Sequence, residues 1–137
     1  MFSSSTGNTK KVAELTKDRL ISLNYDITVK NVLTAKNHDI EAADVLIVGT
    51  PVHGYILFGQ RPTKEVMKFL NQQLPQNMNN KPTLCFATYL FFPAGALNAI
   101  SRAIEKHNGE IIGKYSQRRS NKEQLVEMIV DCIKSLE

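Results

Sequence analysis

The sequence predicts an α/β fold in which helices cover both faces of a parallel β-sheet. Two continuous apolar runs, Val45 to Gly49 and Thr83 to Thr88, have the composition of parallel strands that are buried on both faces. Segments with helical periodicity alternate with strand-like segments along the chain. With 137 residues, of which 42% are hydrophobic, residues 1–137 are expected to form a single domain.

The first third of the chain is expected to hold a helix and an exposed strand ahead of the first buried strand. The helix is expected from Lys10 to Leu23 and the alternating, half-exposed edge strand from Tyr25 to Val32. Leu33 to Ala43 is polar and is expected to be a loop with at most a short helix. The buried strand that begins at Val45 should end at Thr50 and Pro51, because proline cannot donate to a sheet ladder. The apolar face of the helix is set by Val12, Leu15, Leu20 and Leu23.

The middle of the chain is expected to consist of loops around one helix and one strand. Pro51 to Arg61 contains two glycines and two aromatic residues, which predicts a long loop. A helix should begin near Pro62, since proline suits the first helical position. A connecting loop from Leu74 to Lys81 leads to the second buried strand, and an aromatic loop from Tyr89 to Gly95 follows that strand.

The last third is expected to contain two helices around an edge strand. Leu97, Ile100 and Ile104 predict a helix after Gly95, and Ile111 to Tyr115 predicts the strand. The clearest helical stripe of the chain consists of Leu125, Met128, Ile129, Cys132, Ile133 and Leu136.

A hydroxyl-rich segment, Ser4 to Thr9, leads directly into the first helix and is called the first loop below. It has four hydroxyls, one glycine and no charged side chain, so an anion there would be held by backbone N–H groups, hydroxyls and the helix N-terminus. This predicts a phosphate site without a lysine, and an ordinary helix cap is the alternative. The residues are Ser4, Ser5, Thr6, Gly7, Asn8 and Thr9.

Three loops are expected at the carboxyl ends of the strands, where doubly wound sheets bind ligands. They are the first loop, a second loop from Thr50 to Gly59 and a third loop from Thr88 to Gly95. A ligand with a phosphate at one end and a flat ring at the other would satisfy all three. The aromatic residues available for the ring are Tyr55, Phe58, Tyr89, Phe91 and Phe92.

These loops resemble those of a known family. The first loop is similar to the S/T-x-T-G-N-T phosphate loop of flavodoxins, and Gly49 to Gly54 is similar to the flavin-flanking loop of the wider flavodoxin-like family. Thr88 and Tyr89, followed by Pro93 to Leu97, resemble the third loop in flavodoxin-type domains of some electron-transfer proteins. The resemblance implies a flavodoxin-like three-layer sandwich with a parallel sheet of order 2-1-3-4-5.

The first strand of such a sheet is central, yet only Met1 to Ser3 precede the first loop, whereas strands usually have about five or six residues. We therefore expect a truncated first strand that would leave two inner sheet edges unpaired. Either the sequence begins a few residues late, which is favoured, or another segment fills the gap.

The resemblance implies that the ligand is FMN, with its phosphate on the first loop and its ring between the second and third loops. Tyr55 and Tyr89 would be the first candidates to stack on the ring, and Gly54 the peptide that responds to reduction. His53 would either donate to the flavin or be solvated. No catalytic acid or base and no metal ligand is expected. The implied ring-binding residues are Thr50, Pro51, Val52, His53, Gly54, Tyr55, Thr88, Tyr89, Phe91, Phe92 and Gly95.

The implied function is electron transfer between redox partners. A small FMN-dependent reductase of quinones or similar acceptors is an alternative, and a flavodoxin-like protein-interaction module without cofactor is another. The residues do not separate an electron carrier from an oxidoreductase, and the carrier is favoured.

The charge distribution predicts an acidic redox partner, such as a ferredoxin-like protein or a reductase. The net charge is +4, and no acid lies between Asp44 and Glu65 or between Glu65 and Glu105. Flavin loops without acidic residues also predict a less negative reduction potential for the last electron than in acidic flavodoxins. For Phe91 and Phe92, core packing or a homodimer contact is the alternative to a place beside the flavin. The pair Arg118 and Arg119 is expected to be solvated at the start of the last helix.

Several classes of protein are excluded or disfavoured. There is no G-x-x-x-x-G-K-[S/T] motif, no cysteine in the first loop as a phosphatase would need, and Thr50 stands where a response regulator carries aspartate. Scattered cations disfavour nucleic-acid binding. No signal peptide and no apolar run of roughly twenty residues is present, so a cytoplasmic protein without membrane attachment is expected. Cys85 and Cys132 are expected to be buried free thiols.

Overall fold

The central sheet is parallel and has the strand order β1-β4-β5. The computed structural model of the chain describes residues 1–55, 58–92 and 95–137, without the side chains of residues 53–60. The strands are β1 (Leu46–Pro51), β4 (Lys81–Tyr89) and β5 (Gly109–Arg118). β5 lies at the edge of the sheet, as expected, while β1 and β4 are the buried apolar runs of the sequence.

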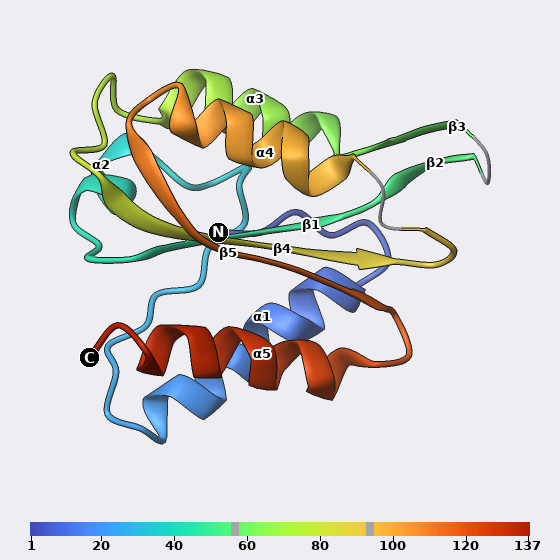
Figure 1. Cartoon of the computed structure of the whole chain (residues 1–137), viewed down its shortest axis with the longest axis horizontal. Helices are drawn as coiled ribbons and strands as arrows, with labels where there is room; N and C mark the ends of the chain where they lie inside the picture. Colours follow the sequence, from blue (N-terminus) through green and yellow to red (C-terminus); the bar gives the residue numbers. More distant parts are fainter. Residues whose placement is uncertain (56–57, 93–94) are drawn as a thin grey trace.

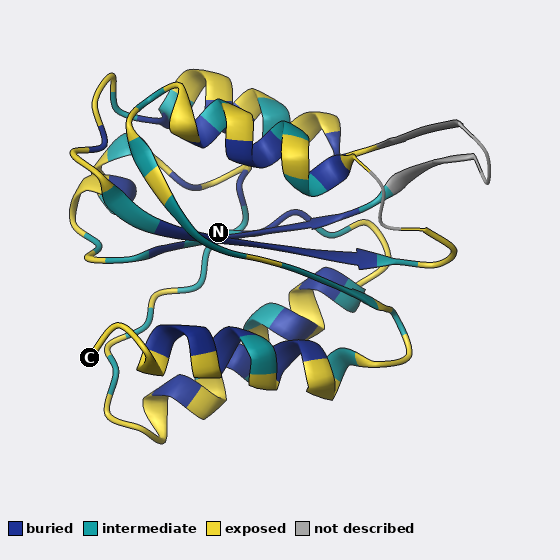
Figure 2. Cartoon of the chain, viewed as in Figure 1, coloured by how far each residue is buried: buried dark blue, intermediate teal, exposed yellow. Residues whose placement is uncertain are grey.

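Helices cover both faces of the sheet (Figure 1). α3 (Lys64–Gln73) and α4 (Ala96–Glu105) lie on one face, and α1 (Asn8–Ile21) and α5 (Lys122–Lys134) lie on the other. The short helix α2 (Asn37–Glu41) precedes β1. Two apolar clusters fill the spaces between the layers, and the inner strands are buried along most of their length (Figure 2). The expected three-layer sandwich is therefore confirmed.

The first three residues occupy the position of the first strand. Phe2 forms parallel bridges to Asn31 on one side and to Gly49 on the other. Its N–H donates to the carbonyl of Lys30 at 3.0 Å, and the N–H of Ser3 donates to the carbonyl of Gly49 at 3.1 Å. Asn31, Phe2, β1, β4 and β5 therefore lie side by side in the expected order 2-1-3-4-5, with isolated bridges at Asn31 and Phe2 in the positions of the second and first strands.

A groove of about 560 Å³ lies ahead of Met1, between the segment 25–29 and β1. The Met1 amino group donates to the carbonyl of Ile47 at 2.7 Å, and both residues line this groove. The prediction of a strand from Tyr25 to Val32 is wrong, because only Asn31 forms a bridge. The alternating pattern is present, but residues 25–29 border the groove, where no adjacent strand supplies a ladder.

The expected loop from Pro51 to Arg61 contains a short antiparallel ribbon. It consists of β2 (His53–Tyr55) and β3 (Phe58–Arg61), which pair with each other only. Ile56 and Leu57 lie outside the described residues. Because the ribbon extends past the central sheet (Figure 1), it does not carry the apolar alternation of a strand packed on a core.

Helix boundaries differ from the predictions by about a turn or less. α3 begins at Lys64 with Thr63 as its N-cap, so Pro62 lies before the helix and not at its first position. α1 ends at Ile21, which leaves Leu23 41% exposed. Leu136 lies beyond α5 and is 44% exposed. Both leucines continue an apolar stripe past the point where the helix ends, so the stripe alone overestimates the buried face.

Candidate functional site

Thr88, near the end of β4, joins the three loops. Its hydroxyl lies 2.9 Å from the hydroxyl of Thr9 in the first loop, and both side chains are buried. Its carbonyl accepts a hydrogen bond of 2.9 Å from the N–H of Val52 in the second loop. Since Thr88 itself begins the third loop, the expected convergence of the three loops at the carboxyl ends of the strands is observed.

The first loop presents polar groups to solvent at the start of α1. Ser5, Thr6 and Gly7 are exposed, whereas Thr9 is buried. Gly7 adopts φ 84°, a left-handed conformation that favours glycine, and it is the N-cap of α1. The Gly7 N–H is held by the Ser4 hydroxyl at 3.0 Å, which closes the loop on itself.

The N-terminus of α1 is suited to an anion. Gly7 has no side chain to cap the helix, and no acidic residue lies in the first turn. The first N–H groups of a helix have no partner within the helix, and they carry the positive end of its dipole. The alternative reading, a loop that serves as a side-chain cap of α1, is not what the structure shows at Gly7.

The second loop is fixed by its own hydrogen bonds. The Thr50 hydroxyl is buried, donates to the carbonyl of Pro51 at 2.9 Å and accepts from the N–H of Thr63 at 3.2 Å. This hydroxyl therefore positions the turn into α3. His53, Gly54 and Tyr55 form β2, with His53 opposite Arg61. The side chains of His53 and Tyr55 lie outside the described residues, so their assigned roles, and that of the Gly54 peptide, stay predictions.

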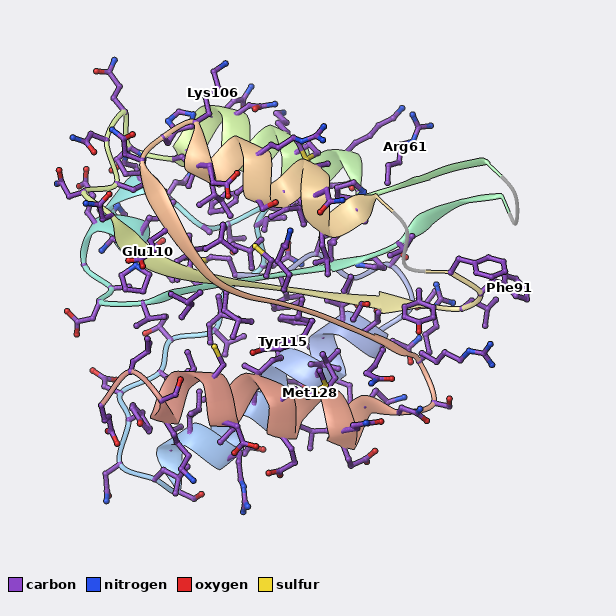
Figure 3. The ribbon with its side chains drawn as sticks, in the orientation of Figure 1. Arg61, Phe91, Lys106, Glu110, Tyr115 and Met128 are labelled. Carbon is purple, nitrogen blue, oxygen red and sulfur yellow. The ribbon has the colours of Figure 1, made fainter. Side chains whose placement is uncertain are left out.

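The third loop exposes a run of apolar side chains. Leu90, Phe91 and Phe92 are 54%, 52% and 51% exposed, so the two phenylalanines are not core residues. Phe91 projects from the end of the molecule at which β4 ends (Figure 3). Tyr89 is half-buried, and its carbonyl accepts a hydrogen bond of 3.0 Å from the N–H of Arg119.

Gly95 is the N-cap of α4, with φ 80°. Like α1, this helix has no side-chain cap and no acid in its first turn. Pro93 and Ala94, which contributed to the resemblance in the third loop, lie outside the described residues.

Lys122 lies beside the first loop, although no motif in the sequence marks it. Its ammonium donates to the side-chain carbonyl of Asn8 at 3.3 Å and to the carbonyl of Arg119 at 2.6 Å. The first loop itself contains no lysine, and Lys122 reaches it from the segment after β5. Its position follows from the topology of the sheet, because the segment after β5 must leave the sheet at the same edge as the first loop.

The arginine pair lies before the last helix and not at its start, and only Arg118 is solvated as expected. Arg118 is the last residue of β5 and is exposed, and α5 begins only at Lys122. Arg119 is half-buried, and its Nε is buried without a hydrogen-bond partner among the described residues. The surroundings of the first and third loops are therefore more cationic than the loop sequences suggest.

Other chemical groups lie away from the loops. Burial raises the pKa of the Cys85 thiol to about 12, and both Cys85 and Cys132 are buried free thiols, as expected. Among the described residues, no cluster of three metal-binding side chains occurs and no helix is long and apolar enough to cross a membrane.

The fold and the three loops define a doubly wound α/β protein with a candidate ligand site at the carboxyl ends of its strands. The family model for the flavodoxin domain matches residues 1–135. The chain therefore belongs to the flavodoxin family. No curated protein matches the chain.

Solved structures with this fold include several flavodoxins. Flavodoxin 1 of Bacillus cereus is 14% identical, with 99% of this chain and 96% of that chain covered and a TM-score of 0.80. The two-electron reduced flavodoxin of Megasphaera elsdenii is 19% identical, with 92% and 93% covered and a TM-score of 0.76. A flavodoxin of Streptococcus pneumoniae TIGR4 is 24% identical, with 95% and 94% covered and a TM-score of 0.74.

Proposed function

We propose that the protein binds FMN and carries electrons between redox partners. The first loop, Ser4 to Thr9, would hold the phosphate, and the second and third loops would border the flavin ring. Bound FMN supplies reversible uptake of electrons, while the protein sets the environment and the access of the ring. The proposal assigns no catalytic acid or base to the chain.

The observation that carries this proposal is the position of Thr88. It connects Thr9 and Val52 through hydrogen bonds of 2.9 Å each, so a single buried residue fixes the spacing of the first and second loops. A ligand with a phosphate and a ring needs this spacing to be constant, because its two ends are covalently joined. Family membership over residues 1–135 supports FMN as that ligand.

The residues present fit a phosphate group. Gly7 leaves the α1 N-terminus without a side-chain cap, and the exposed hydroxyls of Ser5 and Thr6 can each donate to an anion, while the Thr6 oxygen accepts from the Asn8 amide. Residues with carboxylates are absent from the loop itself, so the phosphate would meet no like charge there.

The apolar third loop supports a protein partner. Leu90, Phe91 and Phe92 are each about half exposed at the end of the molecule where the ring would lie. Arg61 and Arg118 are exposed on the neighbouring ribbon and strand. An acidic redox protein, such as a ferredoxin-like protein or a reductase, fits this combination of apolar and cationic residues.

The test is a titration of the purified apoprotein with FMN, followed by flavin absorbance and fluorescence. Stoichiometric uptake with quenched fluorescence is the expected result, whereas a colourless protein that ignores FMN would contradict the proposal and favour an interaction module. Thr88→Val should weaken FMN binding several-fold. The matched control is Thr83→Val, a buried threonine at the other end of β4, which should bind FMN as the unmodified protein does.

The partner and the carrier role are tested separately. Reduced protein should pass electrons to an acidic acceptor protein at a rate that falls as ionic strength rises, and a flat response would remove electrostatic docking. Fast multiple turnover of a quinone with a nicotinamide reductant would favour the reductase alternative over the carrier.

A further inference from the structure

Lys122 is joined to the first loop across almost the whole length of the chain. Its ammonium donates to the side-chain carbonyl of Asn8, 114 positions away, at 3.3 Å. The side-chain amide of Asn8 donates in turn to the Thr6 hydroxyl at 3.0 Å. The ammonium, the amide and the hydroxyl therefore form a continuous polar chain that ends on an exposed residue of the loop.

The positive charge of Lys122 is not neutralised by a carboxylate. In the part of the chain that the structure describes, the ion pairs involve other cations, and the second contact of the Lys122 ammonium is the Arg119 carbonyl at 2.6 Å. Glu123, the acid next in sequence, is exposed in the first turn of α5. A half-buried ammonium held by two neutral oxygens keeps its full attraction for an anion nearby.

The other lysines at the start of α1 do not take this position. Lys10 is exposed and its ammonium lies 3.7 Å from the Glu14 carboxylate, one turn along the helix. Lys11 is exposed as well. Lys122 is thus the lysine that the structure shows bonded to a residue of the first loop.

We propose that Lys122 is the cationic residue of the phosphate site, acting on a phosphate group held by the first loop. This inference rests on the proposed FMN site and extends it by a residue from the opposite end of the chain. Lys122 would stabilise the dianionic phosphate by charge and would hold Asn8 in the orientation that leaves the Thr6 hydroxyl at the loop surface. Binding should therefore depend on the phosphate of the ligand and on ionic strength.

The test compares FMN with riboflavin, which has the same ring and no phosphate. Lys122→Gln should raise the Kd for FMN about tenfold, which is about 1.4 kcal/mol, and should leave the Kd for riboflavin within about twofold. Lys134→Gln is the matched control, because it removes the same charge from the exposed last turn of α5. Lys122→Arg should recover most of the affinity for FMN.

A second readout uses inorganic phosphate alone. Phosphate should raise the melting temperature of the apoprotein and of Lys134→Gln, but not that of Lys122→Gln. Equal losses of FMN and riboflavin affinity in Lys122→Gln would overturn the inference, since they would show a packing role at α5. Unchanged FMN binding in Lys122→Gln would overturn it as well. An unmodified protein that binds no FMN would instead refute the proposed function, and the phosphate shift would then still decide the role of Lys122.

Discussion

Replacing Gly49 by alanine tests how tightly β1 is packed beneath the second loop. An added Cβ at this position would lie 2.1, 2.5 and 2.7 Å from three carbon atoms of the Phe86 ring. Carbon atoms in contact are normally about 3.5–4.0 Å apart, so the ring would have to move by more than about 1 Å. Phe86 is only 2% exposed and belongs to the apolar cluster under α1 and α5, which leaves it little room to move.

The expected loss of stability is about 2 kcal/mol. Overpacking a core costs about 1–3 kcal/mol of stability. Alanine has less conformational freedom than glycine in the unfolded chain, which stabilises the folded state by about 0.4–1 kcal/mol. The close approach argues for the upper end of the first range. With a urea slope of about 2 kcal/mol/M, Gly49→Ala should lower the urea midpoint by about 1 M without changing the slope.

Two comparisons identify the cause of the Gly49→Ala effect. Gly113→Ala places its Cβ 2.8 Å from a ring atom of Tyr115, which is half-buried and can rotate outward, so its loss should stay under about 1 kcal/mol. Adding Phe86→Leu to Gly49→Ala should cost less than the sum of the two single changes. A Gly49→Ala midpoint within about 0.2 M of the unmodified protein, or strict additivity with Phe86→Leu, would refute the clash.

Two further predictions follow from buried or capped groups. Thr63→Ala removes the hydroxyl that accepts from the Val66 N–H and should cost about 1 kcal/mol in urea unfolding, while an unchanged midpoint would argue against this cap. Cys85 is fully buried with its thiol pKa raised to about 12, so a thiol reagent should modify it only as fast as the protein unfolds, and rapid labelling of the native protein would disagree.

Sequence patterns predicted the parts of the fold that depend on local hydrophobicity. β1 and β4 were recognisable because strands buried on both faces need continuous apolar runs. The segment 25–32 shows the limit of this reasoning, since its alternation is that of a strand but hydrogen bonding requires a partner. The β2–β3 ribbon was missed for the opposite reason, because its strands pair only with each other and carry no core-facing pattern.

The candidate site was predictable where it is continuous in sequence. The first loop could be found from its hydroxyls and glycine, and its meeting with the third loop, seen in the contact of Thr9 with Thr88, could be expected from the common direction of parallel strands. Lys122 and Arg119 could not be assigned from composition, because a cation on a helix is usually solvated. The place of Lys122 beside the first loop depends on its contact with Asn8, which exists only after α1 and α5 have packed together.

The contact between Asn8 and Lys122 also sets when the proposed site can exist during synthesis of the chain. The first loop is made first, but its partners at Thr88 and Lys122 follow 79 and 114 positions later than Thr9 and Asn8. A nascent chain that ends before α5 therefore cannot present the complete site, however well α1 has formed. Ligand binding then reports completion of the fold, and a ligand that binds only the finished protein stabilises all of it by mass action.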